Sequence, residues 1–77
     1  PINGIEPQQV AGESGVFVLA LCDGIPVGCG AFRRLDARTV EIKRMFVRAA
    51  ARRRGIAACI LSELEFIAVK RGFSCAR

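Results

Sequence analysis

Three consecutive arginines precede a glycine and a small residue in the stretch "RRRGIA", which spans residues 52–57. A helical pattern of apolar residues follows directly, so the guanidinium groups stand at the end of a helix where the dipole disfavours cations. A helix N-terminus also offers unpaired backbone N–H groups that bind phosphate, and Gly55 lets the backbone approach a ligand closely. Ala57 adds little bulk, and the arginines can add charge-assisted contacts. The stretch is therefore suited to binding a diphosphate.

The basic residues of the chain are concentrated around this stretch. Of its 77 residues, 12 are Lys or Arg and 7 are Asp or Glu, which gives a net charge of +5. Such a cluster is typical of proteins that meet nucleic acid, an anionic membrane or a phosphorylated ligand, and a solvated surface strip has the same composition. Six basic residues fall within twelve positions that contain no acid, namely Lys43, Arg44, Arg48, Arg52, Arg53 and Arg54.

Metal and disulfide chemistry have little support. The chain has no histidine, and its four cysteines form no CxxC pair, so no metal site is expected. Each cysteine stands in an apolar run, which favours reduced core thiols in a cytoplasmic protein. The apolar runs are far shorter than the roughly 20 residues of a membrane span, and no secretory signal is visible. The cysteines are Cys22, Cys29, Cys59 and Cys75.

The strands that must position the basic stretch are predicted as an antiparallel meander. Residues 16–22, "VFVLALC", form a short apolar strand, and Asp23 and Gly24 give a strong hairpin signal after it. A second strand is predicted over residues 25–35 and, after another turn, a third over residues 39–47.

Glycines and alternation add detail to these strands. Gly28 and Gly30 interrupt the second strand and indicate a bulge or a close backbone approach. In the third strand Val40, Ile42 and Phe46 are expected on one face, opposite the intervening Glu41, Lys43 and Met45.

A helix is predicted over residues 55–71, and Gly72 is placed to end it. The segment "FSCAR" then begins another strand, which a crossover helix makes parallel to the third one. The sequence thus predicts an α+β fold: an antiparallel β-meander, an amphipathic helix and the start of a further strand. The apolar stripe of the helix consists of Ile56, Ile60, Leu64, Ile67 and Ala68.

One face of the predicted sheet has no partner. The strand over residues 16–22 is apolar on both faces and requires cover on both sides, but the chain supplies one convincing helix. Either the chain is part of a longer protein or it associates with another copy, and a homo-oligomer is expected.

The stretch "RRRGIA" resembles the acyl-CoA signature [Gln/Arg]-x-x-Gly-x-[Gly/Ala] of the GNAT N-acetyltransferase superfamily. The resemblance extends over residues 16–75 and includes the "DGIPVG" hairpin, the "EIKRMFV" strand and the "RGF" that ends the helix. It implies the central acetyl-CoA-binding portion of the acyl-CoA N-acyltransferase fold, truncated at both ends. Residues 1–15, with two prolines and three glycines, would be an N-terminal loop or arm, and residues 16–77 a partial acetyltransferase domain.

The resemblance also implies where acetyl-CoA would lie. The backbone of Met45, Phe46 and Val47 would contact its pantetheine arm, and an N–H of this segment could polarise the thioester carbonyl. The pyrophosphate would lie on the signature loop, formed by Arg52, Arg53, Arg54, Gly55, Ile56 and Ala57.

For catalysis, the resemblance makes Glu41 the candidate general base, acting directly or through water. The alternative for this residue is an ion pair across the hairpin with Lys43 or Arg33. The chain has no tyrosine, the residue that often protonates the leaving thiolate in this superfamily, so the isolated chain is expected to be inactive. The implied function is transfer of acetyl from acetyl-CoA, without a metal, to a small amine or a protein lysine.

Two other functions remain open. A small basic nucleic-acid-binding module would explain the charge, but only Phe17, Phe32 and Phe46 could provide a stacking platform, and apolar strand residues are more often core. A non-catalytic fragment that dimerises through the open sheet face and binds CoA is the third possibility. Neither nucleic acid nor a membrane is an expected partner.

Overall fold

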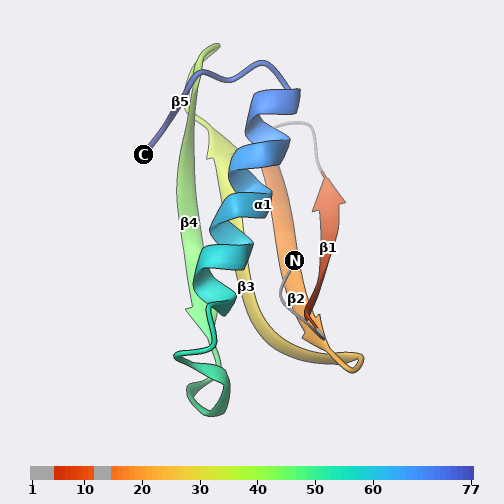
Figure 1. Cartoon of the computed structure of the whole chain (residues 1–77). Coiled ribbons are helices and arrows are strands. Elements are labelled where there is room, and N and C mark those ends of the chain that lie inside the picture. The colour runs from red at the N-terminus through yellow and green to blue at the C-terminus, as the bar shows by residue number, and fades with distance from the viewer. Residues whose placement is uncertain (1–4, 12–14) are drawn as a thin grey trace.

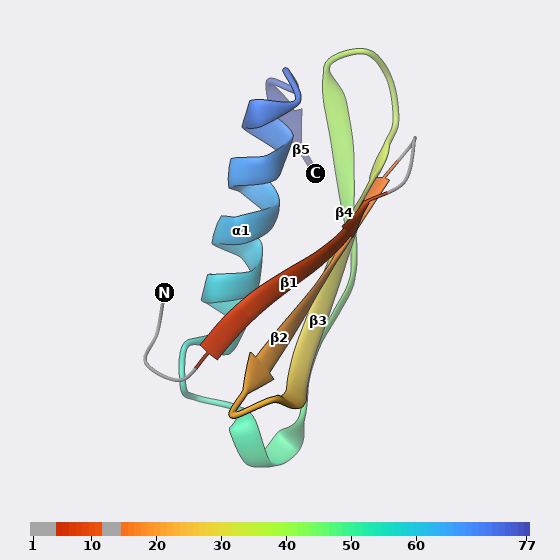
Figure 2. The ribbon, with the colours of Figure 1, turned by 90° about the vertical axis from the view of Figure 1, so that its right-hand side faces the viewer.

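A computed structural model describes residues 5–11 and 15–77 of the chain. In these residues a five-stranded sheet is covered on one face by a single long helix (Figures 1 and 2). The strands lie in the order β1-β2-β3-β4-β5; the first four are antiparallel neighbours, and β5 is parallel to β4. The elements are β1 (Ile5–Ala11), β2 (Gly15–Cys22), β3 (Ile25–Arg34), β4 (Thr39–Val47), the 3-10 turn η1 (Ala49–Ala51), α1 (Ile56–Lys70) and β5 (Cys75–Ala76).

The hairpin between β2 and β3 forms as the sequence predicts. Asp23 and Gly24 have φ angles of 52° and 78°, and the flanking Cys22 and Ile25 are paired. Two successive positive φ angles are the signature of a type I′ turn, which matches the twist of the flanking strands.

Residues 1–15 are predicted to be a loop or an arm, and the loop is wrong where the structure describes them. Residues 5–11 form β1, which pairs with residues 16–22 of β2, from Ile5 opposite Cys22 to Ala11 opposite Val16. Gly15 is the first residue of β2. The edge of β2 would otherwise leave a row of N–H and C=O groups without partners, and an extended segment satisfies them. Pro7 is compatible with this because β1 is an edge strand. Residues 1–4 and 12–14 lie outside the described residues.

The helix α1 covers the sheet with the predicted stripe. It ends at Lys70, and Gly72, whose φ of 91° allows a Schellman motif, follows the C-cap residue Arg71. The N–H of Phe73 donates to the carbonyl of Ala68 at 3.0 Å, and that of Gly72 to Val69 at 2.9 Å. Across the described ranges no helix is long and apolar enough to cross a bilayer. All five residues of the stripe, Ile56, Ile60, Leu64, Ile67 and Ala68, are buried.

Gly28 and Gly30 let α1 lie close to β3. A Cβ on Gly30 would lie 2.5 Å from Met45 Sδ and 2.7 Å from Ile60 Cγ2, and one on Gly28 would lie 2.9 Å from the carbonyl oxygen of Phe46. A close backbone approach is therefore found at Gly28, whereas at Gly30 the neighbouring atoms belong to side chains. The register between β3 and β4 also shifts between Cys29 and Ala31, as a bulge requires.

A β-bulge at Arg44 reverses the faces of the last residues of β4. Lys43 pairs with Ala31 but Phe46 pairs with Cys29, so β4 contains one extra residue, and Arg44 has a φ of 57°. The prediction that Phe46 shares a face with Val40 and Ile42 is therefore wrong. Val40 is buried, whereas Phe46 lies on the opposite face and is 54% exposed.

No described element covers the face of the sheet opposite α1 (Figure 2). Phe17 and Phe46 are exposed on it, and Leu19 is half-buried. The expectation that one face of the sheet lacks cover within this chain is therefore met by the described residues.

Candidate functional site

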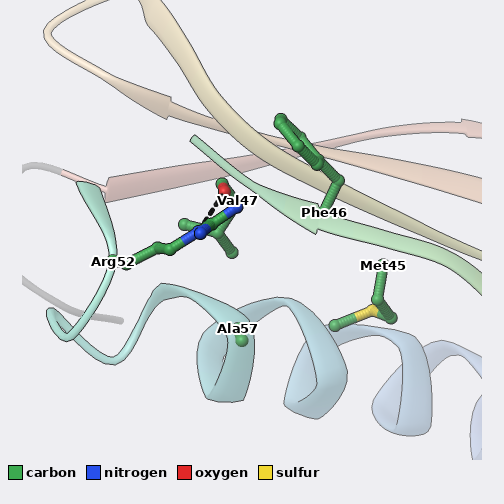
Figure 3. A pocket seen from close by; sticks show the side chains of 5 residues that line it. All are labelled: Met45, Phe46, Val47, Arg52 and Ala57. Carbon is green, nitrogen blue, oxygen red and sulfur yellow. Dashed lines mark hydrogen bonds between the residues drawn. The ribbon is translucent and has the colours of Figure 1, made fainter. Parts of the chain in front are cut away.

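The C-terminal end of β4 and the N-terminal end of α1 enclose a hollow of about 350 Å³. Its lining comes from β4, from α1 and from the loop over residues 48–55 that joins them. The residues are Met45, Phe46, Val47, Arg52 and Ala57, and all five are among the predicted cofactor-binding residues (Figure 3).

The bulge decides which face each β4 side chain takes beside this hollow. Met45 points toward α1 and Phe46 points away from it (Figure 3). Within the described residues β5 pairs only with Thr39 and Val40, and the C=O of Arg77 accepts the N–H of Ile42 at 2.8 Å. The β4 edge beyond Ile42, including the backbone at the hollow, has no described strand beside it.

The loop that joins β4 to α1 is held by hydrogen bonds to strand carbonyls. Arg52 Nε donates to the carbonyl of Val47 at 3.1 Å (Figure 3). The backbone N–H of Arg48 donates to Val27 at 2.8 Å, and Ala51 is buried. These contacts set the position of the helix N-terminus relative to the end of β4.

The backbone before α1 has two residues in the left-handed region. Arg53 has a φ of 66° and the N-cap residue Gly55 a φ of 75°. A left-handed residue followed by helical ones turns successive N–H groups into one concavity, which binds anions. No side chain caps this helix, and its first turn has no acidic residue. The first N–H groups of any helix have no partner within the helix, and here no capping side chain provides one.

The remaining loop residues differ in what they can present to a ligand. Ile56 is 1% exposed and packs in the core, so only its backbone faces the loop. Arg53 and Arg54 are exposed beside the hollow but do not line it. Among the described ion pairs none involves Arg52, Arg53 or Arg54. The cations at the helix N-terminus are thus not neutralised by the described part of the protein.

Glu41 lies outside the hollow. Arg33 Nε donates to Glu41 Oε1 at 2.7 Å, and Lys43 Nζ lies 3.9 Å from the same oxygen. The hydrogen bond from Arg33 holds the pKa of Glu41 below its ordinary value of 4.5, although desolvation opposes this shift. The structure therefore contains the ion pair that was the alternative to catalysis for this residue, and a role as general base stays a prediction.

The cysteines are free thiols in environments that only partly match the predicted core. Cys22 and Cys59 pack against the core, whereas Cys75 is exposed because β5 lies at the edge of the sheet. Cys29 Sγ donates to the carbonyl of Arg44 at 3.5 Å and so contacts the bulge. Over residues 5–11 and 15–77 no group of three or more His, Cys, Asp or Glu is placed to hold a metal ion.

The bulge at Arg44 is the feature of the site that sequence reasoning missed. Bulges with a positive φ favour Gly, Asn or Asp, and an arginine carries no such signal. The breakdown of alternation after Lys43, where "RMF" contains two apolar neighbours, is the one trace of it in the sequence.

Comparisons with known proteins agree with this geometry. A sequence model of the Acetyltransferase (GNAT) family matches residues 4–76. The fold is similar to that of a GNAT family acetyltransferase from Elizabethkingia anophelis with acetyl-CoA bound, at 18% identity and a TM-score of 0.82, over 92% of this chain and 61% of that chain. No curated protein sequence matches.

Two further solved structures have higher sequence identity. An aminoglycoside acetyltransferase from an uncultured soil metagenomic sample is 27% identical with a TM-score of 0.78, over 86% of this chain and 47% of that one. A GNAT family acetyltransferase from Staphylococcus aureus Mu50 is also 27% identical, with a TM-score of 0.71, over 77% and 38%. The chain thus spans between 38% and 61% of the length of these three structures.

Proposed function

The chain belongs to the acetyltransferase (GNAT) family, and from this premise we propose that it provides the acetyl-CoA-binding part of an N-acetyltransferase that acts on a primary amine. The observation that carries the proposal is the hollow between the open edge of β4 and an uncapped helix N-terminus flanked by arginines. A ligand with a diphosphate at one end and an extended amide-containing arm matches both parts of it.

The diphosphate would bind at the loop that precedes α1. Gly55 and the first residues of α1 present N–H groups into one concavity, and the helix dipole favours an anion there. Arg53 and Arg54 are close enough in the chain to add charge. The ligand would remove the repulsion among these cations, which the described part of the protein leaves in place.

The pantetheine arm would lie along β4. The backbone from Met45 to Val47 has an open edge within the described residues, so its N–H and C=O groups can pair with the amides of the arm as a strand would. Met45 and Ala57 would provide apolar contacts on the side of α1.

Acetyl transfer then requires an amine beside the thioester. The amine nitrogen forms a bond to the carbonyl carbon, the C–S bond breaks, the nitrogen loses a proton, and the thiolate of CoA takes one up. A β4 N–H near Met45 could donate to the oxyanion of the tetrahedral intermediate. We keep Glu41 as a candidate base only through a chain of water molecules, because its carboxylate is bound by Arg33 and lies outside the hollow.

A pair of glycine variants tests the diphosphate site. Gly55→Glu places negative charge and bulk where the diphosphate would lie, and we expect it to abolish binding of CoA measured by isothermal titration calorimetry. Gly72→Glu is the matched control, because Gly72 also has a positive φ but lies at the other end of α1 with nothing within 4 Å of an added Cβ. Circular dichroism establishes that both variants fold. Unchanged CoA affinity in a folded Gly55→Glu variant would overturn the site.

A further inference from the structure

A cluster of three charged residues lies on the sheet face opposite α1. Arg33 pairs with Glu41 and Ala31 pairs with Lys43 in the register of β3 and β4, which places the three charged side chains on one face. Glu41 Oε1 accepts from Arg33 and lies 3.9 Å from Lys43 Nζ. Two cations thus share one carboxylate, and the cluster retains a net positive charge.

Arg33 is held in a fixed orientation by this pair. Its Nε–H donates to Glu41 at 2.7 Å, and the side chain is 57% exposed. Within the described residues its hydrogen bond to Glu41 uses Nε alone, so the two terminal nitrogens keep N–H donors for a ligand. These nitrogens form a planar fork whose geometry matches a carboxylate.

This cluster is connected to the hollow along the same sheet face. Phe46 lines the hollow, points away from α1 and pairs with Cys29 (Figure 3). Moving along β3 and β4 from there, the next position on this face is Lys43 beside Ala31, and the one after it is Glu41 beside Arg33. Their partners Ala31 and Arg33 are two and four residues from Cys29, so at about 3.3 Å per residue Lys43 and Glu41 lie roughly 7 and 13 Å from Phe46. We call this sequence of residues the outer strip: Phe46, Ala31, Lys43 and Arg33.

We propose that the outer strip binds the acceptor, and that the acceptor is an amine that also carries a carboxylate. Arg33 and Lys43 bind the carboxylate, the apolar surface at Ala31 and Phe46 contacts the spacer, and the amine is directed toward the hollow. The proposal rests on the function proposed above, because it places the acceptor beside the same thioester.

The charges of the strip argue against a polycationic acceptor. Glu41 is the strip's neighbouring carboxylate, and it is already bound by two cations. A polyamine or an aminoglycoside would meet net positive charge at Arg33 and Lys43, whereas a carboxylate is attracted and finds a directional partner.

The proposal can be tested with two ligands of equal length. NMR spectra of the full 15N-labelled chain report the Nε–Hε group of each arginine. We expect aminooctanoate to shift the Arg33 signal in a saturable manner, and diaminooctane, which has an amine in place of the carboxylate, to leave it unchanged. Equal or larger shifts with diaminooctane, or an equal response to inorganic phosphate, would overturn the proposal.

Two neighbouring arginines supply the matched variants. Arg33→Gln should weaken aminooctanoate binding about tenfold, the value of one well-oriented charged contact. Arg34→Gln should leave aminooctanoate binding unchanged, because Arg34 is the next residue of the strand and lies on the other face. It is a matched control, since its Nε is also bound, to the carbonyl of Asp36 at 3.2 Å. Equal effects of the two variants would contradict the assignment.

The same variants separate this proposal from the CoA site. Arg33→Gln should retain full affinity for CoA in calorimetry. If the unaltered chain does not bind CoA, the proposed function is refuted. If it binds CoA but its Arg33 signal does not respond to aminooctanoate, only the proposed acceptor class is refuted.

Discussion

At the level of single residues, Arg52 has a different position from the two arginines that follow it. Its Nε–H is bound to the carbonyl of Val47, and its side chain lines the hollow, whereas Arg53 and Arg54 are exposed beside it. This contact joins the last residue of β4 to the loop before α1. Arg52 is therefore suited to set the width of the hollow, and the other two arginines are suited to supply charge.

Two substitutions of Arg52 separate hydrogen bonding from charge. Arg52→Gln keeps a side-chain N–H that can donate to Val47, and we expect it to retain most of the CoA affinity. Arg52→Met removes the donor, and we expect about a tenfold loss, since a hydrogen bond of a charged group contributes about 1.5–3 kcal/mol. Calorimetric titration with CoA measures both. Equal losses in the two variants would show that the charge of Arg52 matters and its contact with Val47 does not.

At the level of elements, two glycines of β3 allow α1 to pack close to the sheet. Gly28 and Gly30 lie under α1, where Ile60 and Met45 take the space that side chains would need. This allows the N-terminal turn of α1 to lie beside the end of β4, which is the geometry of the hollow. The bulge at Arg44 then turns Met45 toward the helix and Phe46 to the other face.

A methyl group at Gly30 should disturb this contact. We expect Gly30→Ala to lower the free energy of unfolding by about 1–3 kcal/mol, because overpacking forces Met45 and Ile60 to move. Urea unfolding followed by circular dichroism measures the change. In the double variant Gly30→Ala with Met45→Ala, the loss should be smaller than the sum of the single losses, since the second change vacates part of the space. Strict additivity, or an unchanged stability of Gly30→Ala, would contradict the close packing.

At the level of the whole molecule, the cations differ in whether an acidic partner neutralises them. On the sheet face opposite the helix, where Phe17 and Phe46 are exposed, Arg33 and Lys43 share the carboxylate of Glu41. The arginines before α1 take part in none of the described ion pairs. This difference favours the helix N-terminus, rather than the aromatic sheet face, as the site of a compact phosphorylated ligand. Association of two copies through the open face stays a prediction.

Thermal denaturation of the full chain compares the two kinds of ligand. We expect CoA to raise the melting temperature and a short oligonucleotide of equal charge to have little effect, because only CoA can fill both the hollow and the concavity before α1. Raising the salt concentration should reduce the effect of CoA in part, as the exposed arginines are screened. Equal stabilisation by the oligonucleotide would favour the nucleic-acid-binding alternative.

Much of the fold and of the site could be predicted from local signals. Asp23 and Gly24 specify a type I′ turn, the apolar stripe of α1 has helical spacing, and Gly72 is suited to the left-handed residue that ends the helix. The five residues that line the hollow all belong to the predicted site, because the spacing between a strand end and the next helix is short and places them together.

Other features depended on contacts between distant residues. The segment over residues 5–11 carries loop signals and becomes a strand because β2 offers it an unpaired edge. Arg44 adopts a positive φ that its side chain does not favour, and the pairing of β4 with β3 on either side maintains it. For Glu41 the sequence allowed either a catalytic role or an ion pair across the hairpin. The ion pair forms because the register places Arg33 directly opposite.

The sequence by itself determined the order of the elements, the buried face of the helix and the loop suited to a diphosphate, because each of these follows from the conformational preferences and spacing of neighbouring residues. Only the tertiary structure decided which way Met45 and Phe46 point, which partner Glu41 takes and where β1 lies. Those outcomes depend on strand register, and register is set by packing and hydrogen bonds between strands that no single segment encodes.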